Sequence, residues 1–147
     1  MFYEYKPYTA LVTGRGENVK QIPSREELTI LLVFPGVFVS TKEAYSLVDE
    51  QISLQNTAFC KEWSNQFDLS KEFRKPVAEW QFVNDFTAPV SNKFLEIQRA
   101  LVALKETGAL FADMSGSGAT VFGVFEDTVS AQRAKKVLDL NWKTVLV

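Results

Sequence analysis

The sequence predicts an α+β fold of the ferredoxin-like split β-α-β type, in which an antiparallel sheet carries helices on one face and follows short N-terminal strands. The chain has 147 residues, of which 46% are hydrophobic and 23% charged, enough to bury one core of ordinary size. From residue 28 onward, apolar β-rich runs and amphipathic stretches follow in the order β-α-(helical insertion)-α-β-β-α-β. We expect one domain over residues 1–147, with N-terminal strands in 1–24 and the ferredoxin-like core in 25–147.

The composition excludes several function classes. A single cysteine, Cys60, and the absence of histidine exclude disulfide frameworks, Cys/His zinc sites and hydrolases that need an imidazole base. The net charge of -2 predicts no nucleic-acid partner. No apolar run approaches the roughly 20 residues of a membrane span, and Met1 to Tyr5 lack the features of a signal peptide. We expect a cytoplasmic protein that does not bind membranes.

The N-terminal third predicts three strands. Residues 2–5 and 8–13 are aromatic and β-branched, which favours a hairpin or two short strands. Gly14-Arg-Gly-Glu17 then predicts a β-turn with a solvated Arg/Glu pair. Residues 28–34 form a continuous apolar run that stops at Pro35-Gly36. This pattern predicts a strand that is central in the sheet and buried on both faces.

The middle of the chain predicts one clear helix and a less regular insertion. Ser40-Thr-Lys-Glu43 matches a capping box, so we expect a helix from about 41 to 52. Residues 53–74 mix polar and aromatic types without a period, which predicts short helical pieces and loop. Pro76 is suited to open another short helix, and Asn84-Asp85 is typical of a turn or cap.

The C-terminal part predicts a helix, a strand hairpin, a helix and a last strand. The first helix places apolar residues at helical spacing and ends at a glycine suited to a left-handed exit. In order, the expected elements are a helix over 91–106 ending at Gly108, a strand over 109–113, a Gly-rich turn over 114–118, a strand over 119–125, an amphipathic helix opening at Asp127 and a strand over 142–147.

The Gly-rich turn, Ser115-Gly116-Ser117-Gly118, is the sharpest candidate for chemistry. Small residues between two strands let backbone N–H groups and two hydroxyls converge on an anion. The alternative is a hairpin turn whose glycines adopt positive φ. The segment is neither a Walker A loop nor a dinucleotide fingerprint, since Val121 stands at the third glycine position and a strand follows.

Two other places offer weaker candidates. Thr41 and Tyr45 are four residues apart on one helix face, where a hydroxyl and a ring are able to meet a ligand. Alternatively, Thr41 supports the first turn and Tyr45 packs against the sheet. Asn84-Asp85 is able to position a ligand hydroxyl or a metal, or else to cap a helix. Cys60 is expected to be a small core residue.

Five segments together resemble the GHMP kinases. The stretch Ala112-Asp-Met-Ser-Gly-Ser-Gly-Ala-Thr-Val-Phe122 resembles the third motif of that superfamily, the Gly-rich loop of its C-terminal domain. Four further pieces follow the order seen in members that phosphorylate 4-diphosphocytidyl-2-C-methyl-D-erythritol. They are Gly14 to Glu17, Phe34 to Val37 with Ser40, Thr41 and Tyr45, Asn84 to Phe86, and Gly108-Ala109. Only residues from about 53 to 78 match poorly, and their role stays unassigned.

The resemblance implies a fold and a reaction. The C-terminal domain of these kinases is ferredoxin-like, and the implied activity is ATP- and Mg²⁺-dependent phosphorylation of an alcohol group in non-mevalonate isoprenoid biosynthesis. By the same resemblance, Tyr45 stacks on the cytosine of the cytidylyl substrate and Thr41 places a hydroxyl near it. Ser115 to Gly118 border the region of phosphoryl transfer. Stacking on an aromatic ring contributes roughly 1–3 kcal/mol per base.

The resemblance also marks what this sequence lacks. The ATP-binding loop, the lysine and the catalytic aspartate of these kinases belong to sequence upstream of Met1, so we assign this chain no catalytic residue and no metal ligand. We expect the C-terminal, substrate-binding half of such a kinase, inactive alone and binding neither ATP nor Mg²⁺. Its partner is then the missing N-terminal domain, and the edge at Phe2 to Tyr5 favours self-association. The alternative is a free-standing ferredoxin-like binding or regulatory module without catalysis.

Overall fold

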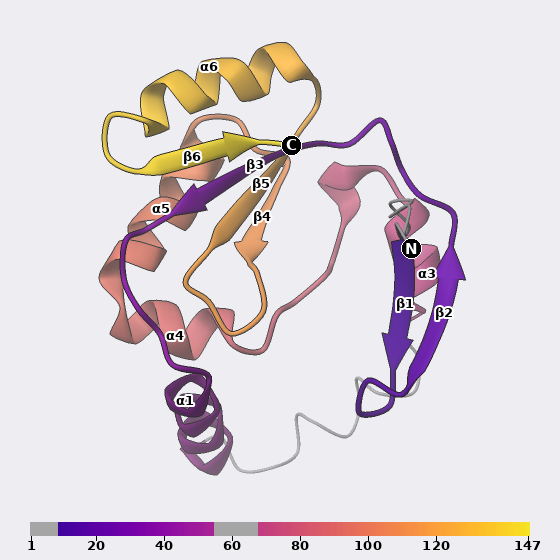
Figure 1. Cartoon of the computed structure of the whole chain (residues 1–147), viewed down its shortest axis with the longest axis vertical. Helices are drawn as coiled ribbons and strands as arrows, with labels where there is room; N and C mark the ends of the chain where they lie inside the picture. Colours follow the sequence, from indigo (N-terminus) through magenta and orange to yellow (C-terminus); the bar gives the residue numbers. More distant parts are fainter. Residues whose placement is uncertain (1–8, 55–67) are drawn as a thin grey trace, which may run out of the picture.

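The computed structural model describes residues 9–54 and 68–147 and contains a four-stranded antiparallel sheet in the order β4-β5-β3-β6 (Figure 1). Its strands are β3 (Thr29–Phe34), β4 (Phe111–Met114), β5 (Val121–Phe125) and β6 (Lys143–Leu146). Within this sheet β3 lies between β5 and β6, and all neighbouring strands are antiparallel. This arrangement confirms the predicted ferredoxin-like fold and the central position of β3.

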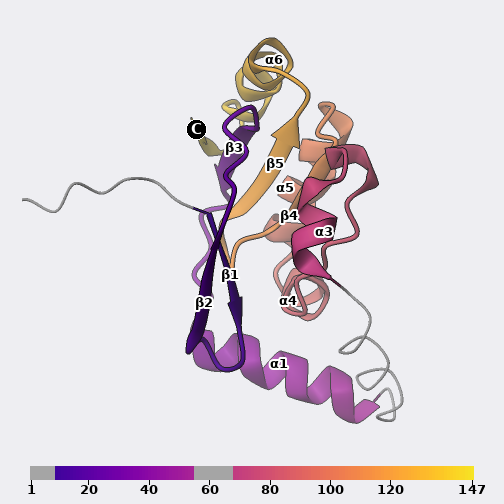
Figure 2. The same cartoon turned by 90° about the vertical axis from the view of Figure 1, so that its right-hand side faces the viewer.

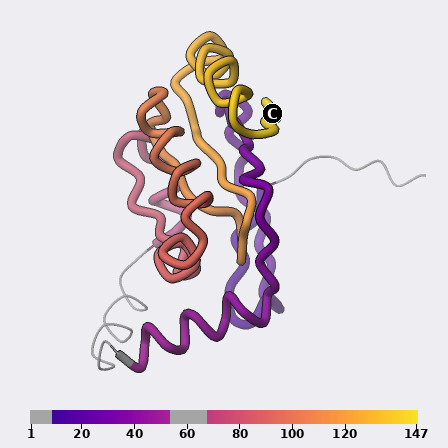
Figure 3. Tube along the Cα trace, turned by 90° about the vertical axis from the view of Figure 1, so that its left-hand side faces the viewer, coloured from indigo at the N-terminus to yellow at the C-terminus, as the bar shows by residue number. Residues whose placement is uncertain are grey.

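Four helices form the core with one side of this sheet: the last two along the chain pack on its face, the second packs on the third, and the first packs on the second (Figures 1 and 3). They are α1 (Thr41–Leu54), α4 (Thr87–Lys93), α5 (Leu95–Glu106) and α6 (Thr128–Leu138). Leu31 and Val33 of β3 are fully buried, as are Ile97 and Leu104 of α5, while Leu138 of α6 is almost so. The apolar spacing that predicted these helices is therefore the spacing that fills the core.

The expectation that β3 is buried on both faces is wrong. Buried and half-buried residues alternate along the strand, and Ile30, Leu32 and Phe34 point to the second face. Only the short helices α3 (Leu69–Arg74) and η2 (Val77–Glu79), with the segment after them, pack there among the described residues. A single layer of helices buries one face of an antiparallel sheet, whereas a continuous apolar run does not show which face that is.

The expectation of one helix over 91–106 is also wrong. The structure has two helices, α4 and α5, which meet at Phe94 with φ -107° and ψ 86°. The N–H of Phe94 donates to the Val90 carbonyl at 2.8 Å, and its own carbonyl accepts from the Ile97 N–H at 2.9 Å. Periodicity missed the break because residues on both sides of Phe94 still face the same core. The helix exit at Gly108, with φ 98°, is confirmed.

The N-terminal part forms a separate hairpin of β1 (Thr9–Thr13) and β2 (Asn18–Ile22) (Figure 2). Gly14 to Glu17 form the predicted turn, but the turn joins β1 to β2, a strand that was not predicted; the expected partner of residues 8–13 was 2–5. However, the Glu17 carboxylate accepts from the backbone N–H of Arg15 rather than pairing with its guanidinium. The predicted strand at residues 2–5 and Cys60 lie outside the described residues, as does most of 53–67. Within the described ranges, no helix is long and apolar enough to cross a membrane.

Candidate functional site

The Gly-rich segment is the connection between β4 and β5. The Ser115 N–H donates to the Thr120 carbonyl at 2.8 Å, and the Gly118 N–H donates to the Ser115 carbonyl at 3.2 Å. Gly116 and Gly118 have φ values of 58° and 96°, which only glycine adopts without strain. The turn geometry is therefore as expected of a hairpin, and it leaves Ser115 and Gly116 exposed. Anion binding by this loop stays a prediction.

Asn84 ties this loop to the segment that precedes α4. Its side-chain Nδ2 donates to the carbonyls of Met114 and Gly116, both at 2.8 Å. Its Oδ1 accepts from the Phe86 N–H at 3.0 Å, which is the turn predicted for Asn84-Asp85. The contact to the loop was not predicted, because it joins positions about thirty residues apart and nothing local in the sequence marks it.

A buried carboxylate lies at the base of the same loop. Asp113, the third residue of β4, accepts from the Asn84 N–H at 3.2 Å, from the Met114 N–H at 2.7 Å and from the Thr87 hydroxyl. These donors satisfy the carboxylate within the protein. In addition, the described part of the chain holds no group of three or more Asp, Glu, Cys or His side chains that is suited to a metal ion.

The predicted substrate residues lie on the first two turns of α1. Thr41 is the first residue of the helix and is exposed. Tyr45 follows one turn later and is 57% exposed, so the alternative that it packs against the sheet is not what the structure has. Its ring and that of Phe86 form a T-shaped pair, with centroids 4.9 Å apart and planes at 83°. Their roles toward a ligand stay predictions.

Residues 84–86 link the two candidate regions. Phe86 contacts Tyr45, and two positions earlier Asn84 holds the Gly-rich loop. The Phe86 N–H bond to Asn84 Oδ1 keeps these two residues in a fixed relation. The structure thus connects the predicted stacking residue with the predicted phosphate loop through three consecutive residues.

An aromatic pocket of about 350 Å³ opens on the second face of the sheet. Its walls include Trp80 and Phe82 from the segment after η2, and Phe111 from β4; the Trp80 and Phe111 ring centroids are 5.5 Å apart. Asn84 and Asp113 are the polar residues of its lining. Neither Thr41 nor Tyr45 lines this pocket.

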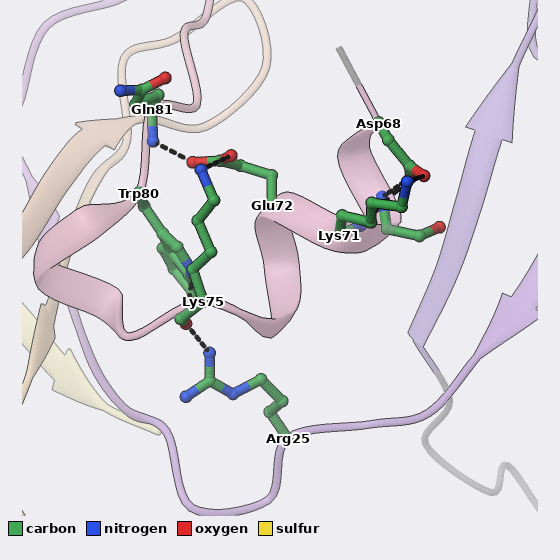
Figure 4. Close-up of polar contacts among 8 residues, drawn as sticks. Arg25, Asp68, Lys71, Glu72, Lys75, Trp80 and Gln81 are labelled. Atoms are coloured by element: carbon green, nitrogen blue, oxygen red, sulfur yellow. Dashed lines mark hydrogen bonds and ion pairs between the residues drawn. The ribbon is translucent and has the colours of Figure 1, made fainter.

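Arg25 fastens α3 and η2 over this face, a role that sequence reasoning did not foresee (Figure 4). Its Nη1 donates to the carbonyls of Phe73 and Lys75 at 2.9 and 2.8 Å, and its guanidinium lies 5.6 Å from the centre of the Trp80 ring. Because the guanidinium contacts both carbonyls and ring faces, a lysine at this position would not replace it. These contacts span about fifty positions, so no local pattern reveals them.

A buried carboxylate completes the attachment of α3 (Figure 4). Glu72 accepts from the Gln81 N–H at 2.6 Å and pairs with Lys75 Nζ at 2.8 Å. The bond from Lys75 and that from the Gln81 N–H hold the pKa of Glu72 below its ordinary value, against the opposing effect of desolvation. At the other end of α3, Asp68 accepts from the Ser70 and Lys71 N–H groups and caps the helix.

Comparison with known protein families identifies the domain. The model of the C-terminal domain of the GHMP kinases matches residues 69–144, just over half of the chain. The chain belongs to the GHMP kinase family. The match begins at α3 and ends in β6, so it includes the Gly-rich loop and Asn84 but not Thr41 or Tyr45.

Curated relatives of this GHMP kinase domain extend the similarity to α1 and the hairpin. The 4-diphosphocytidyl-2-C-methyl-D-erythritol kinase of Thermodesulfovibrio yellowstonii is 34% identical over 146 residues, which is 99% of this chain and 50% of that protein. The enzyme of the same name from Parabacteroides distasonis is 41% identical over 117 residues, 78% of this chain and 39% of the relative. The chain spans about half the length of the curated relatives it matches.

Solved structures support the same fold. A crystal structure of a 4-(cytidine 5'-diphospho)-2C-methyl-D-erythritol kinase aligns with a TM-score of 0.66 at 21% identity, covering 93% of this chain and 48% of that one. A homoserine kinase from Cytophaga hutchinsonii aligns with a TM-score of 0.52, also at 21% identity, over 94% and 46% of the two chains. These likenesses confirm the α+β fold of this GHMP kinase domain.

Proposed function

We propose that this chain is the acceptor-binding half of a kinase that transfers a phosphoryl group from ATP, with Mg²⁺, to the methylerythritol unit of 4-diphosphocytidyl-2-C-methyl-D-erythritol. In this role α1 supplies the cytidylyl contact, and the loop from Ser115 to Gly118 borders the transferred phosphate. A second half supplies the nucleotide loop and the catalytic aspartate. The proposal rests on family membership and on relatives that carry this enzyme name.

The observation that carries the acceptor assignment is the exposed ring of Tyr45. A large aromatic side chain with 57% exposure, held in a T-shaped contact with Phe86, is free to stack on a planar base without being buried itself. The Thr41 hydroxyl stands one helical turn away on the same face. Together they form a short polar and aromatic strip that suits a nucleobase with a hydroxylated extension.

The activity test uses the longest natural polypeptide that includes these residues, together with the 147-residue chain alone. With ATP, Mg²⁺ and the cytidylyl compound, we expect turnover by the longer polypeptide and none by the chain alone, since phosphoryl transfer requires the nucleotide to be held in line with the acceptor. Binding of the cytidylyl compound without turnover by either would favour the alternative, a binding module without catalysis. Turnover by the 147 residues alone would show that the second half is not needed.

The acceptor site is tested by two substitutions at one position. Tyr45→Ala removes the ring, and we expect KM for the cytidylyl substrate to rise roughly 5- to 150-fold, the range that corresponds to one stacked base. Tyr45→Phe keeps the ring and is expected to stay close to the wild-type KM. An unchanged KM in Tyr45→Ala would remove Tyr45 from the site.

A further inference from the structure

We propose that Asn84 is a positioning residue for phosphoryl transfer, which holds the Gly-rich loop in the orientation that presents its N–H groups to an anion. This inference rests on the proposed function. Asn84 lies outside the loop, at the turn before α4, and reaches it only through its side-chain amide. No contact between Asn84 and a ligand is needed for this role.

The hydrogen bonds of Asn84 explain why the residue is an asparagine. Its Nδ2 donates to the Met114 and Gly116 carbonyls at 2.8 Å each, and its Oδ1 accepts from the Phe86 N–H at 3.0 Å. An amide offers two donor hydrogens and an acceptor, and this arrangement uses both kinds of group. Aspartate has no donor for the two carbonyls, and a shorter side chain does not reach them.

The bond to the Gly116 carbonyl decides which way the next peptide group faces. In a trans peptide the C=O and the following N–H point in opposite directions. With the Gly116 carbonyl turned toward Asn84, the Ser117 N–H is turned away from Asn84. Gly116 has φ 58° and no Cβ to restrict its backbone, so the residue itself places little restraint on the orientation of this peptide. Asn84 supplies the restraint that the loop lacks.

The restraint matters because phosphoryl transfer depends on prearranged donors. A flipped peptide would direct the Gly116 carbonyl, and not the Ser117 N–H, at a phosphate, and two oxygen acceptors repel each other. Fixed donors around a developing charge are a large part of catalysis, and they cost no reorganisation when the reaction occurs. Asn84 therefore acts on the rate through the loop, while its own donor groups are occupied by carbonyls.

The test compares Asn84→Ser with Thr87→Val in the longest natural polypeptide. Asn84→Ser keeps an oxygen for the turn at Phe86 and loses the bonds to the loop. Thr87→Val removes the hydroxyl bond to Asp113 from the same network but leaves the loop carbonyls on Asn84. We expect kcat to fall roughly ten- to hundredfold in Asn84→Ser, as for a small misplacement of the reacting groups, with little change in KM for the cytidylyl substrate. Thr87→Val keeps its kcat.

A second measurement does not depend on activity. Hydrogen–deuterium exchange of peptides that span residues 113–120 should be faster in Asn84→Ser than in the wild type and unchanged in Thr87→Val. Unaltered exchange, or equal losses of kcat in both variants, would overturn the positioning role. If the wild-type polypeptide shows no kinase activity, the proposed function fails, and the exchange result alone decides whether Asn84 holds the loop.

Discussion

At the scale of single residues, the two glycines of the Gly-rich loop differ in what surrounds them. Both have positive φ, but a Cβ on Gly118 would lie 2.8 Å from the sulfur of Met114, whereas one on Gly116 would meet open space. Met114 is itself almost fully buried. Gly118 is therefore required for packing as well as for the turn, and Gly116 for the turn alone.

This difference predicts two unequal substitutions. Gly116→Ala should cost roughly 1–2 kcal/mol of unfolding free energy, because alanine has a Cβ and would have to adopt the left-handed backbone conformation of Gly116. Gly118→Ala should cost about 1–3 kcal/mol more, because the buried Met114 side chain must also move. Urea unfolding of both variants measures the difference. Equal losses would show that Met114 repacks freely.

The candidate site could be predicted from the sequence only where its chemistry is local. The turn at Asn84 and the Gly-rich hairpin both follow from residue types at adjacent positions, and both are present. The side-chain bonds from Asn84 to the loop and from Arg25 to the carbonyls near α3 could not be predicted, since each joins distant segments. Such contacts depend on the complete fold.

At the scale of elements, a capping box in the local sequence determines where α6 begins. Asp127 Oδ1 accepts from the Ser130 N–H at 2.7 Å, and the Ser130 hydroxyl completes a capping box. These bonds hold the pKa of Asp127 below its ordinary value. The helix begins where the sequence predicted it, because this cap requires only residues that are near one another.

The cap gives a prediction for α6. Asp127→Ala leaves the first N–H groups of the helix without an acceptor, and we expect a loss of about 1 kcal/mol in unfolding free energy. Asp127→Ser keeps an acceptor at the same position and should lose much less. Thermal unfolding monitored by circular dichroism compares the two. A similar loss in both variants would assign the stabilisation to the charge and not to the cap.

The attachment of α3 predicts a response to acid. Because the folded pKa of Glu72 is lowered from its ordinary value of 4.5, its contribution to stability is complete above that value and is lost as pH falls through the lowered one. Glu72→Gln keeps an acceptor for the Gln81 N–H but does not titrate. The unfolding midpoint of this variant should therefore depend less on pH in the acid range. A slope equal to that of the wild type would contradict the assignment.

The elements also show where pattern reasoning failed. Two predictions failed, the burial of the second face of β3 and the continuous helix across Phe94. In both cases the apolar residues were recognised, but the sequence does not show which elements pack against them. An apolar run does not reveal how many layers cover it, and a helical period continues across a break when both pieces face one core. The strands β4 to β6 and the helix α6 form at the predicted places, because the Gly-rich turn joins β4 to β5 and a cap at Asp127 opens α6.

At the scale of the whole molecule, the hairpin of β1 and β2 stands apart from the four-stranded sheet (Figure 1). Val12 and Val19 are cross-strand partners, and they are 52% and 59% exposed. A two-stranded hairpin is marginally stable alone in water. We therefore expect this surface to pack against protein from outside the 147 residues, in line with the proposed second half.

The exposed hairpin predicts how the isolated chain behaves. We expect it to self-associate as its concentration rises, because the apolar pair and the strand edges offer a contact to a second copy. Val12→Thr combined with Val19→Thr keeps the β-branched shape and removes apolar surface, so it should weaken the association. Sedimentation velocity measures both chains. A wild-type chain that remains monomeric at high concentration would contradict the expectation.

The four residues from Asn84 to Thr87 have a consequence for how this family is able to vary in length. Asn84 bonds to the loop, Phe86 contacts Tyr45, and Thr87 bonds to Asp113, so three separate partners constrain four consecutive positions. One inserted or deleted residue would turn at least one of these side chains away from its partner. Gaps in an alignment of related sequences should therefore avoid this stretch, even though it belongs to neither a long helix nor a strand.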